Sequence, residues 1–340
     1  MDFTLFHCFP DLDPSPTAWN ALVSQSLNNV PFLRWEYLRT WWETRGGGEW
    51  LQSELVLVIA RQDGLLTGIA PLISTRNRDG LPSLMLLGSI EISDYLDLIV
   101  RPADLSTFLS GLLNFLASSP NVPDWQVLDW HNIPEASPTL PALKVAVKEP
   151  GWVVSQERTY HAPAIPLPGD FDLYLSGIDK KQRHEIRRKM RRAAETGGVR
   201  WYIANELSTL EAEVDAFLAL MGDDPAKAMF LTEAMHRQMH LSCRVAFENG
   251  WLQLAFLEVN GQKAAGYLNF DYMNRIWVYN SGIDRRFVEL SPGWVLLGQL
   301  LQWANENHRL EFDFMRGEEQ YKYRFGAVDR FVVRVRVTRP

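Results

Sequence analysis

Cysteine and long apolar runs are the two features that this sequence has least of. Only Cys8 and Cys243 occur in 340 residues, so no disulfide framework is expected and a reducing cytoplasm is the simplest location. No apolar run approaches the roughly 18 residues that span a bilayer. The first residues, MDFTLFHCFPDLDP, lack a basic start and a sustained apolar region, so we expect no signal peptide. A soluble protein is therefore predicted.

A general excess of basic residues is also missing. The chain has 34 Lys and Arg against 41 Asp and Glu, a net charge of -7, which argues against a nucleic-acid surface over the whole protein and leaves room for a local one. The length predicts two domains. Because residues 132–168 are rich in proline and loop signals, we expect an N-terminal domain over residues 1–160 and a C-terminal domain over residues 161–340.

A pattern of elements occurs twice in the chain. Residues 54–130 read as strand, Asp-Gly turn, strand, strand, helix and strand, and residues 251–314 repeat this order with an Asn-Gly turn. Asp63-Gly64 and Asn260-Gly261 are the pairs favoured in two-residue hairpins. Similarity of pattern without similarity of residues indicates a duplicated α/β domain with a mixed sheet. Two such copies would offer a cleft between them.

The stretch LEFDFMRGEEQYKYRFG, residues 310–326, contains the densest set of polar groups. Its alternating start predicts a half-buried strand, and Gly317 predicts a turn. Acids, a phenol and cations follow directly, which is typical of a catalytic loop. A strand followed by a solvated turn explains the same residues, and both interpretations remain open. The candidate catalytic residues are Asp313, Arg316, Glu318, Tyr321 and Lys322, with Glu319 as a further acid.

Ser291-Pro292-Gly293 begins a helix that we expect to reach Asn307. Ser is a favoured N-cap and Pro fits the first turn, so the amides of Gly293, Trp294 and Val295 would be open to a phosphate or carboxylate. Arg285 and Arg286 would add positive charge. A well-capped helix with no ligand is the alternative.

Residues 180–192 form an unusually basic helix. Eight cations accompany one acid, Glu185, and Ile186, Met190 and Ala193 make a narrow apolar stripe. The cations would face solvent, where they could meet phosphates of a cofactor or of RNA, or form an ordinary solvated face. Helices are also expected over residues 207–221 and 227–241. His236 and His240 in the second of these lack the partners of a metal site, so none is predicted. In the last strand, residues 330–337, the arginines should be exposed.

Together, the basic helix, the Asn-Gly hairpin, the Ser-Pro-Gly helix start and DFMRGEEQYKYRFG resemble the GNAT-fold acyltransferases of the CelD/BcsL type, which are relatives of the FemAB peptidyltransferases. The resemblance is strongest over residues 170–330. It rests most on Asp313, Arg316, Gly317, Tyr321 and Lys322. It implies two GNAT-like domains in tandem, the second with the donor site. It also implies acyl-CoA as co-substrate, its pyrophosphate at the start of the helix from Pro292, although the usual Q/R-x-x-G-x-G/A loop is absent.

The implied reaction is direct transfer of an acyl group to an amine or hydroxyl. Asp313 or Glu318 would act as base, Tyr321 would protonate or orient the leaving thiolate, and Lys322 and Arg316 would hold an anionic group. The acceptor would be a small molecule or a precursor of polysaccharide or cell envelope. Two alternatives remain open. One is a peptidyltransferase that takes aminoacyl-tRNA on the basic helix, and the other is a GNAT-like subunit without catalysis in an envelope assembly.

Overall fold

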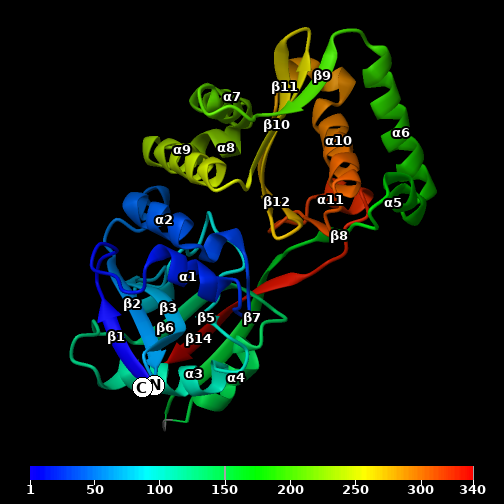
Figure 1. Cartoon of the computed structure of the whole chain (residues 1–340). Coiled ribbons are helices and arrows are strands. Elements are labelled where there is room, and N and C mark those ends of the chain that lie inside the picture. Colours follow the sequence, from blue (N-terminus) through cyan, green and yellow to red (C-terminus); the bar gives the residue numbers. More distant parts are fainter. Residues whose placement is uncertain (149–150, 340) are drawn as a thin grey trace. The chain divides into compact units, whose positions relative to one another are not determined.

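The computed structural model describes residues 1–148 and 151–339. The chain divides into two compact units (Figure 1). The first comprises residues 1–160 together with the end of the chain from Phe331, and the second comprises His161–Arg330. Residues 331–340, which the sequence-based division assigned to the C-terminal domain, therefore belong with the first unit. Among the described residues, every helix is too short or too polar to cross a membrane.

The first unit is built on a sheet of eight strands, in the order β1-β2-β3-β4-β6-β14-β7, with β5 paired to β3. Asp63 and Gly64 both have positive φ, as the two-residue turn between β2 and β3 requires. The elements of this unit are β1 (Asp2–Phe6), α1 (Pro16–Val23), η1 (Pro31–Leu33), α2 (Trp35–Gly48), β2 (Glu54–Gln62), β3 (Leu65–Arg76), β4 (Pro82–Leu86), β5 (Ile99–Val100), α3 (Leu105–Ser118), β6 (Val127–Pro134), α4 (Thr139–Ala146), β7 (Val153–His161) and β14 (Phe331–Thr338).

The second unit is built on a sheet of six strands, in the order β8-β13-β12-β11-β10-β9. Asn260 and Gly261 form the positive-φ turn between β10 and β11. The elements of this unit are β8 (Ala164–Pro166), α5 (Phe171–Gly177), α6 (Lys180–Glu195), β9 (Val199–Ile203), α7 (Leu210–Gly222), α8 (Pro225–Phe230), α9 (Glu233–Glu248), β10 (Leu252–Val259), β11 (Gln262–Tyr272), β12 (Arg275–Ile283), η2 (Arg285–Leu290), α10 (Pro292–Glu306), β13 (Glu311–Asp313) and α11 (Gln320–Arg324).

The two sheets share one plan. In each, an antiparallel meander (β2-β3-β4 or β10-β11-β12) is followed by a helix and then by a strand parallel to the third meander strand. β1 and β9 pair with the first meander strand of their sheets, and β14 and β8 pair with the parallel strand. This confirms the duplicated mixed α/β fold expected from the repeated pattern.

Strands β12 and β13 pair over a short distance only. The parallel register joins Arg275–Trp277 to Glu311–Asp313, and β12 then continues for six more residues without β13 beside it. Within that extension Tyr279 is skipped in the register with β11, which is a β-bulge. One edge of β12 is therefore left uncovered by strand pairing, next to the start of α10.

Helix α10 forms the centre of the second unit's core. Its apolar stripe, which includes Leu296, Leu297, Leu300 and Leu301, is fully buried and packs with residues of β10, β11 and β12. Gly298 of α10 lies against Met190 of α6, where an added Cβ would be 2.8 Å from the sulfur. The absence of a side chain at Gly298 lets the basic helix pack closely on α10.

Several local expectations differ from the structure. The helix expected over residues 227–241 is two helices, α8 and α9, because Asp224 caps α8 and Thr232 caps α9 through their side chains. Arg334 of β14 is mostly buried rather than exposed and makes two hydrogen bonds to Asp129. The short strands β1, β8 and β9 and the helix α1 lie in regions for which the sequence pattern predicted no element.

Candidate functional site

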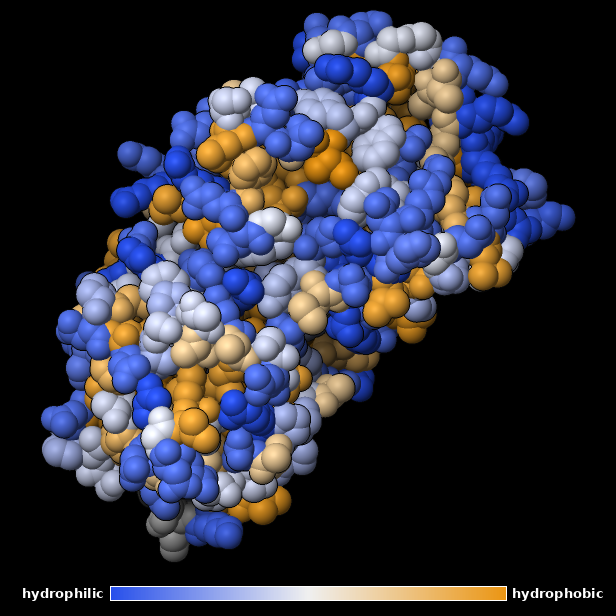
Figure 2. Space-filling model, in the orientation of Figure 1, coloured by the Kyte–Doolittle hydropathy of each residue, from blue (hydrophilic) through white to orange (hydrophobic). Residues whose placement is uncertain are grey.

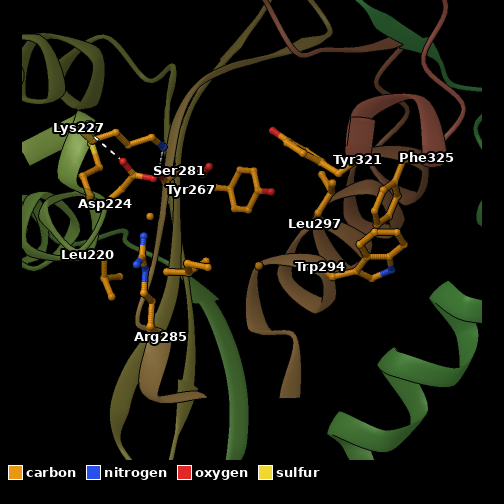
Figure 3. Close-up of a pocket in the computed structure, with 14 residues that line it drawn as sticks. Leu220, Asp224, Lys227, Tyr267, Ser281, Arg285, Trp294, Leu297, Tyr321 and Phe325 are labelled. Carbon is orange, nitrogen blue, oxygen red and sulfur yellow. Dashed lines mark hydrogen bonds between the residues drawn. The ribbon is translucent and has the colours of Figure 1, made fainter. Parts of the chain in front are cut away.

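A pocket of about 300 Å³ opens in the second unit beside the end of β12. Figure 3 shows side chains of α7 and α8 on one side of the strands and those of α10 and α11 on the other. Apolar side chains make most of its wall, with a few polar groups among them, as is usual for binding sites. The lining residues are Leu220, Met221, Asp224, Lys227, Tyr267, Ser281, Gly282, Ile283, Arg285, Gly293, Trp294, Leu297, Tyr321 and Phe325.

The start of helix α10 lies at this pocket. Ser291 is in the left-handed region, with φ 51° and ψ 52°, and its side chain makes no capping hydrogen bond, so the expected Ser N-cap is absent. The amide of Val295 donates to the Ser291 carbonyl at 3.0 Å and is not open to a ligand. Within the described chain, the amides of Gly293 and Trp294 have no partner. They leave the positive end of the helix dipole available.

The two arginines before α10 have different surroundings. Arg286 makes four contacts with Asp284, three of them from its guanidinium at 2.6–3.1 Å. These contacts raise the pKa of Arg286 above its ordinary value and lower that of Asp284. Arg285 instead lines the pocket. It is the arginine whose charge is available there.

Two phenols line the pocket, one buried and one partly buried. Tyr267 of β11 is only 4% exposed, and Tyr321 of α11 packs edge-on against Phe314 at 5.9 Å between ring centroids. Their hydroxyls point into the space between β11 and α11 (Figure 3). Burial, with a smaller effect from Glu319, raises the pKa of Tyr321 well above its usual value. Burial, Tyr321 and Glu319 do the same to the pKa of Tyr267. Both phenols are therefore neutral hydrogen-bond donors near pH 7.

Across β12, Lys227 extends from α8 to the bulged strand. Its ammonium donates to the side chain of Asn280 at 2.9 Å and to the carbonyl of Ser281. Burial lowers the pKa of Lys227, although the charges of Asp224 and Glu319 oppose this. Asp224 accepts from the amides of Ala226 and Lys227 and so begins α8. These contacts hold α8 against the pocket.

The geometry of this unit has known counterparts. Residues 180–323 match the family model described as "Acetyltransferase (GNAT) domain". The second unit is a GNAT domain. Comparison by sequence with curated proteins gave no significant match.

Solved structures show that the tandem arrangement is also known. FemX is 11% identical to this chain, with a TM-score of 0.67; the match covers 98% of this chain and 97% of the FemX chain. L-PGS from Bacillus licheniformis is 11% identical, covers 96% and 92%, and has a TM-score of 0.56. The tandem GNAT protein from the clavulanic acid biosynthesis pathway is 12% identical, covers 100% and 99%, and has a TM-score of 0.50. At these identities the likeness is one of fold, and it confirms two GNAT-like domains in tandem.

The chain thus carries an acyltransferase domain of the GNAT superfamily, as the motif resemblance led us to expect. The GNAT domain brings Arg285, Gly293, Trp294 and Tyr321 to one pocket. Arg286 is turned to Asp284, and Ser291 and Val295 form the backbone behind the helix tip.

The other motif residues stabilise the turn before Tyr321 in the GNAT domain. Lys322 is 3% exposed, and its ammonium donates to the carbonyls of Phe314, Arg316 and Gly317 at 3.0–3.3 Å. It also pairs with Glu319 at 2.8 Å. Gly317 has φ +116°, and a Cβ there would be 2.5 Å from the Glu319 carboxylate. A buried lysine thus fixes a turn that only glycine fits easily.

Two of the acids predicted as bases are held away from the pocket lining. Asp313 is 1% exposed, accepts from the amide of Met315 at 2.7 Å and pairs with Arg330 at 3.0 Å. Glu318 is exposed and lies 3.4 Å from His161. Glu319 is the acid of this turn whose charge reaches Tyr267, Tyr321 and Lys227.

Sequence reasoning did not single out Asp224, Lys227, Tyr267 or Ser281. Tyr267 lies inside an apolar strand and Lys227 in a short helix, and neither has a neighbour in sequence that indicates chemistry. Only strand pairing and helix packing bring them to the pocket.

The basic helix α6 keeps part of its charge free. Arg187 pairs with Asp172, and Arg188 and Lys189 pair with Glu185. For Lys180, Lys181 and Arg192 the described residues provide no acidic partner. Figure 2 shows hydrophilic residues over the edge of the molecule where α6 lies.

Proposed function

We propose that the GNAT domain transfers an acyl group from acyl-CoA to an amine acceptor. The observation that carries this proposal is that one pocket holds both the open amides at the start of α10 and the neutral phenol of Tyr321. A helix N-terminus favours phosphate, and a neutral phenol can protonate a leaving thiolate. The two groups suit opposite ends of an acyl thioester linked to a pyrophosphate.

The residues present fit a donor of this kind. An added Cβ at Gly293 would lie 2.9 Å from the Cγ2 atom of Ile283, so glycine lets the helix tip lie close against the end of β12. Arg285 would add a guanidinium for phosphate, and the amides of Gly293 and Trp294 would donate to its oxygens. The uncovered edge of β12 offers backbone groups for the extended arm of the donor. These features take the place of the missing glycine-rich loop.

Acyl-CoA would supply the acyl group as an activated thioester. The acceptor nitrogen forms the new C–N bond as the C–S bond breaks, and the electron pair of that bond stays on sulfur. Tyr321 gives its proton to the sulfur. Glu319, the acid of the turn whose charge acts on Tyr321, takes the proton that the amine loses, and this proton restores Tyr321 through solvent. We retain Asp313, Arg316, Glu318 and Lys322 as residues that support this loop.

CoA binding measured by calorimetry tests the donor. We expect Arg285→Gln to weaken binding about 10-fold, because a charge-assisted hydrogen bond contributes on the order of 1.5–3 kcal/mol. Arg286→Gln is the matched control, since its side chain faces Asp284, and it should leave affinity unchanged within about twofold. Equal effects of the two variants, or no CoA binding by the wild type, would contradict the proposal.

The helix tip is tested separately with Gly293→Leu. Its side chain would displace Ile283, because the added Cβ would lie 2.9 Å from the Cγ2 atom of Ile283, and it would hinder phosphate, so CoA affinity should fall at least about 10-fold in protein that circular dichroism shows to be folded. Gly222→Leu, where nothing lies within 4 Å of an added Cβ, is the control. Unchanged affinity in Gly293→Leu would place the phosphates elsewhere.

A second candidate function is transfer from aminoacyl-tRNA, and the exposed cations of α6 favour it. A triple variant with Lys180→Gln, Lys181→Gln and Arg192→Gln should bind tRNA more weakly than the wild type. It should also reduce the slope of log affinity against log salt by about 2, because each phosphate contact releases a counterion. Binding of tRNA without binding of CoA would support this function over the first. Binding of neither ligand, by a protein that co-purifies with an envelope enzyme, would support a subunit without catalysis.

A further inference from the structure

Lys227 brings a partly buried amine to the pocket from α8. Its ammonium donates to the side chain of Asn280 at 2.9 Å and to the carbonyl of Ser281, and the residue lines the same pocket as Gly293. Figure 3 shows its side chain reaching from α8 to β12. Within the described chain these two groups are its hydrogen-bond partners, and no carboxylate lies at ion-pair distance. The pocket proposed for an acyl donor thus contains an amine of the protein itself.

The hydrogen bonds of Lys227 determine which proton it can lose. A lysine ammonium has three N–H groups. Asn280 and Ser281 hold two of them, so the third is the one that can pass to water. Burial lowers the pKa of Lys227, against the opposing charges of Asp224 and Glu319. More of this lysine than of an exposed one is therefore a free amine at neutral pH, and a free amine is a nucleophile.

The place of this amine on β12 suits attack on a bound thioester. Ser281 lies in the part of β12 that continues beyond its pairing with β13, the uncovered edge that we assign to the extended arm of the donor. The charge of Glu319, from the turn before α11, acts on both Lys227 and Tyr321, so the amine and the phenol share a charged neighbour. An amine held in this way beside a donor reacts without having to be captured from solution.

Resting on the proposed CoA donor, we propose that Lys227 is a self-acylation site, whose side chain takes the acyl group when no other amine is bound. The free amine forms the new C–N bond as the C–S bond breaks, and the electron pair of that bond stays on sulfur. The nitrogen then gives up one more proton, which reaches the thiolate through solvent. The products are an amide at Lys227 and free CoA, and the lysine has lost its positive charge.

A time course with acetyl-CoA tests this site, with the acetylated lysines identified by peptide mass spectrometry. We expect acetylation of Lys227 to be at least about 10-fold faster than that of Lys180 and Lys181, which are exposed on α6, because only Lys227 shares a pocket with the donor. An excess of CoA, which has no acyl group to give, should slow the reaction at Lys227 by occupying the pocket. It should leave the rates at Lys180 and Lys181 unchanged.

Lys227→Arg keeps the charge and removes the nucleophile, so the fast acetylation should disappear. Lys263→Arg is the matched control, since Lys263 is also partly buried but pairs with Glu213 at 3.2 Å and does not line the pocket; its Lys227 should react as in the wild type. The wild-type time course decides the question even if a variant folds poorly. If calorimetry shows CoA binding but Lys227 reacts no faster than Lys180 and Lys181, the self-acylation site is refuted while the CoA donor stands. If CoA does not bind and Lys227 has no advantage, both are refuted.

Discussion

Lys322 is a charged side chain with almost no access to water. Its ammonium lies among three backbone carbonyls and the carboxylate of Glu319. A buried ammonium is tolerated only when such partners replace its hydration. The lysine therefore determines the path of the turn that delivers Tyr321 to the pocket.

The free energy of unfolding of Lys322→Met should be about 2–4 kcal/mol lower than that of the wild type. The substitution leaves three carbonyls and an acid unpaired in a poorly hydrated turn. Urea unfolding measures this difference. Glu318→Gln, at an exposed carboxylate 3.4 Å from His161, should change stability by less than about 1 kcal/mol. If Lys322→Met kept full stability and lost turnover alone, Lys322 would act in chemistry and not as a support.

Asp97, in the first unit, predicts a dependence of stability on pH. The carboxyl is fully buried and accepts from Ser137, Thr139 and the amide of Leu98, and burial raises its pKa to about 6. In the unfolded chain the value is about 3.9. Between these values the folded state holds a proton that the unfolded state has released, so stability falls as pH rises from about 4 to about 6.

The variant Asp97→Asn cannot titrate and should lose that dependence. The unfolding free energy of the wild type relative to Asp97→Asn should decrease by about 3 kcal/mol over this range, from two pKa units at 1.36 kcal/mol each. Urea unfolding at several pH values checks it. Parallel curves for the two proteins would show that Asp97 keeps its charge on folding.

Some residues of the pocket could be predicted from short sequence patterns, and others could not. Gly293 follows Ser-Pro at a helix start, Arg285 precedes it and Tyr321 lies in a polar motif, so short patterns were enough to select them. Tyr267 and Lys227 reach the pocket through the pairing of β11 with β12 and the packing of α8, which no short pattern encodes. For Asp313 the short pattern misled. The sequence suggested a catalytic base, whereas in the structure its carboxylate is buried and held by an ion pair with Arg330.

At the level of elements, β14 is attached to β6 by charge as well as by backbone pairing. Arg334 donates to both oxygens of Asp129, at 2.7 and 2.8 Å, and Asp129 is fully buried. Burial would raise the pKa of Asp129, but hydrogen bonds from Arg334 and His131 lower it below the ordinary value. The ion pair with Asp129 therefore determines that Arg334 is the arginine of β14 that faces inward.

Arg334→Leu should destabilise the first unit by about 3–5 kcal/mol, because it leaves a buried carboxylate without its arginine, with only Asn77 and His131 still beside it. Arg336→Leu, two residues along the same strand and 3.5 Å from the half-exposed Asp79, should cost less than about 1 kcal/mol. Thermal or urea unfolding of the two variants checks this. Equal losses of stability in the two variants would mean that any substitution of an arginine in this strand is destabilising, and that the ion pair with Asp129 is not the cause.

Elements with strong local signals were predictable. The Asp-Gly and Asn-Gly turns fixed two hairpins, and the apolar stripe of α10 fixed a long helix. Local patterns failed where the decision was tertiary. The strand β9 is short and half-buried at a sheet edge, and β14 has a clear alternation that does not say which of two sheets it joins.

On the scale of the whole molecule, the second unit is inserted between two neighbouring strands of the first. The chain leaves the first sheet at β7 and returns as β14, which lies between β6 and β7. The GNAT domain is thus continuous in sequence, whereas the first unit is assembled from both ends of the chain.

A chain that ends at Arg330 should lose the fold of the first unit and keep that of the second. Removal of β14 exposes both of its neighbours and leaves Asp129 without Arg334, while no element of the second sheet is lost. We expect the early strands to become protease-sensitive, with residues 161–330 persisting as a resistant fragment that binds CoA as the full chain does. Resistance of residues 1–160 in the truncated protein would contradict this.

The position of β14 has a consequence for biosynthesis. While the ribosome is still translating the second unit, the amino-terminal sheet lacks an interior strand, and it can close only after β14 has been synthesised and has left the exit tunnel. The later-encoded domain is complete by then. Domains usually mature in the order in which they are translated; here the order of completion is reversed, and the nascent amino-terminal half is a natural client for chaperones until β14 has emerged.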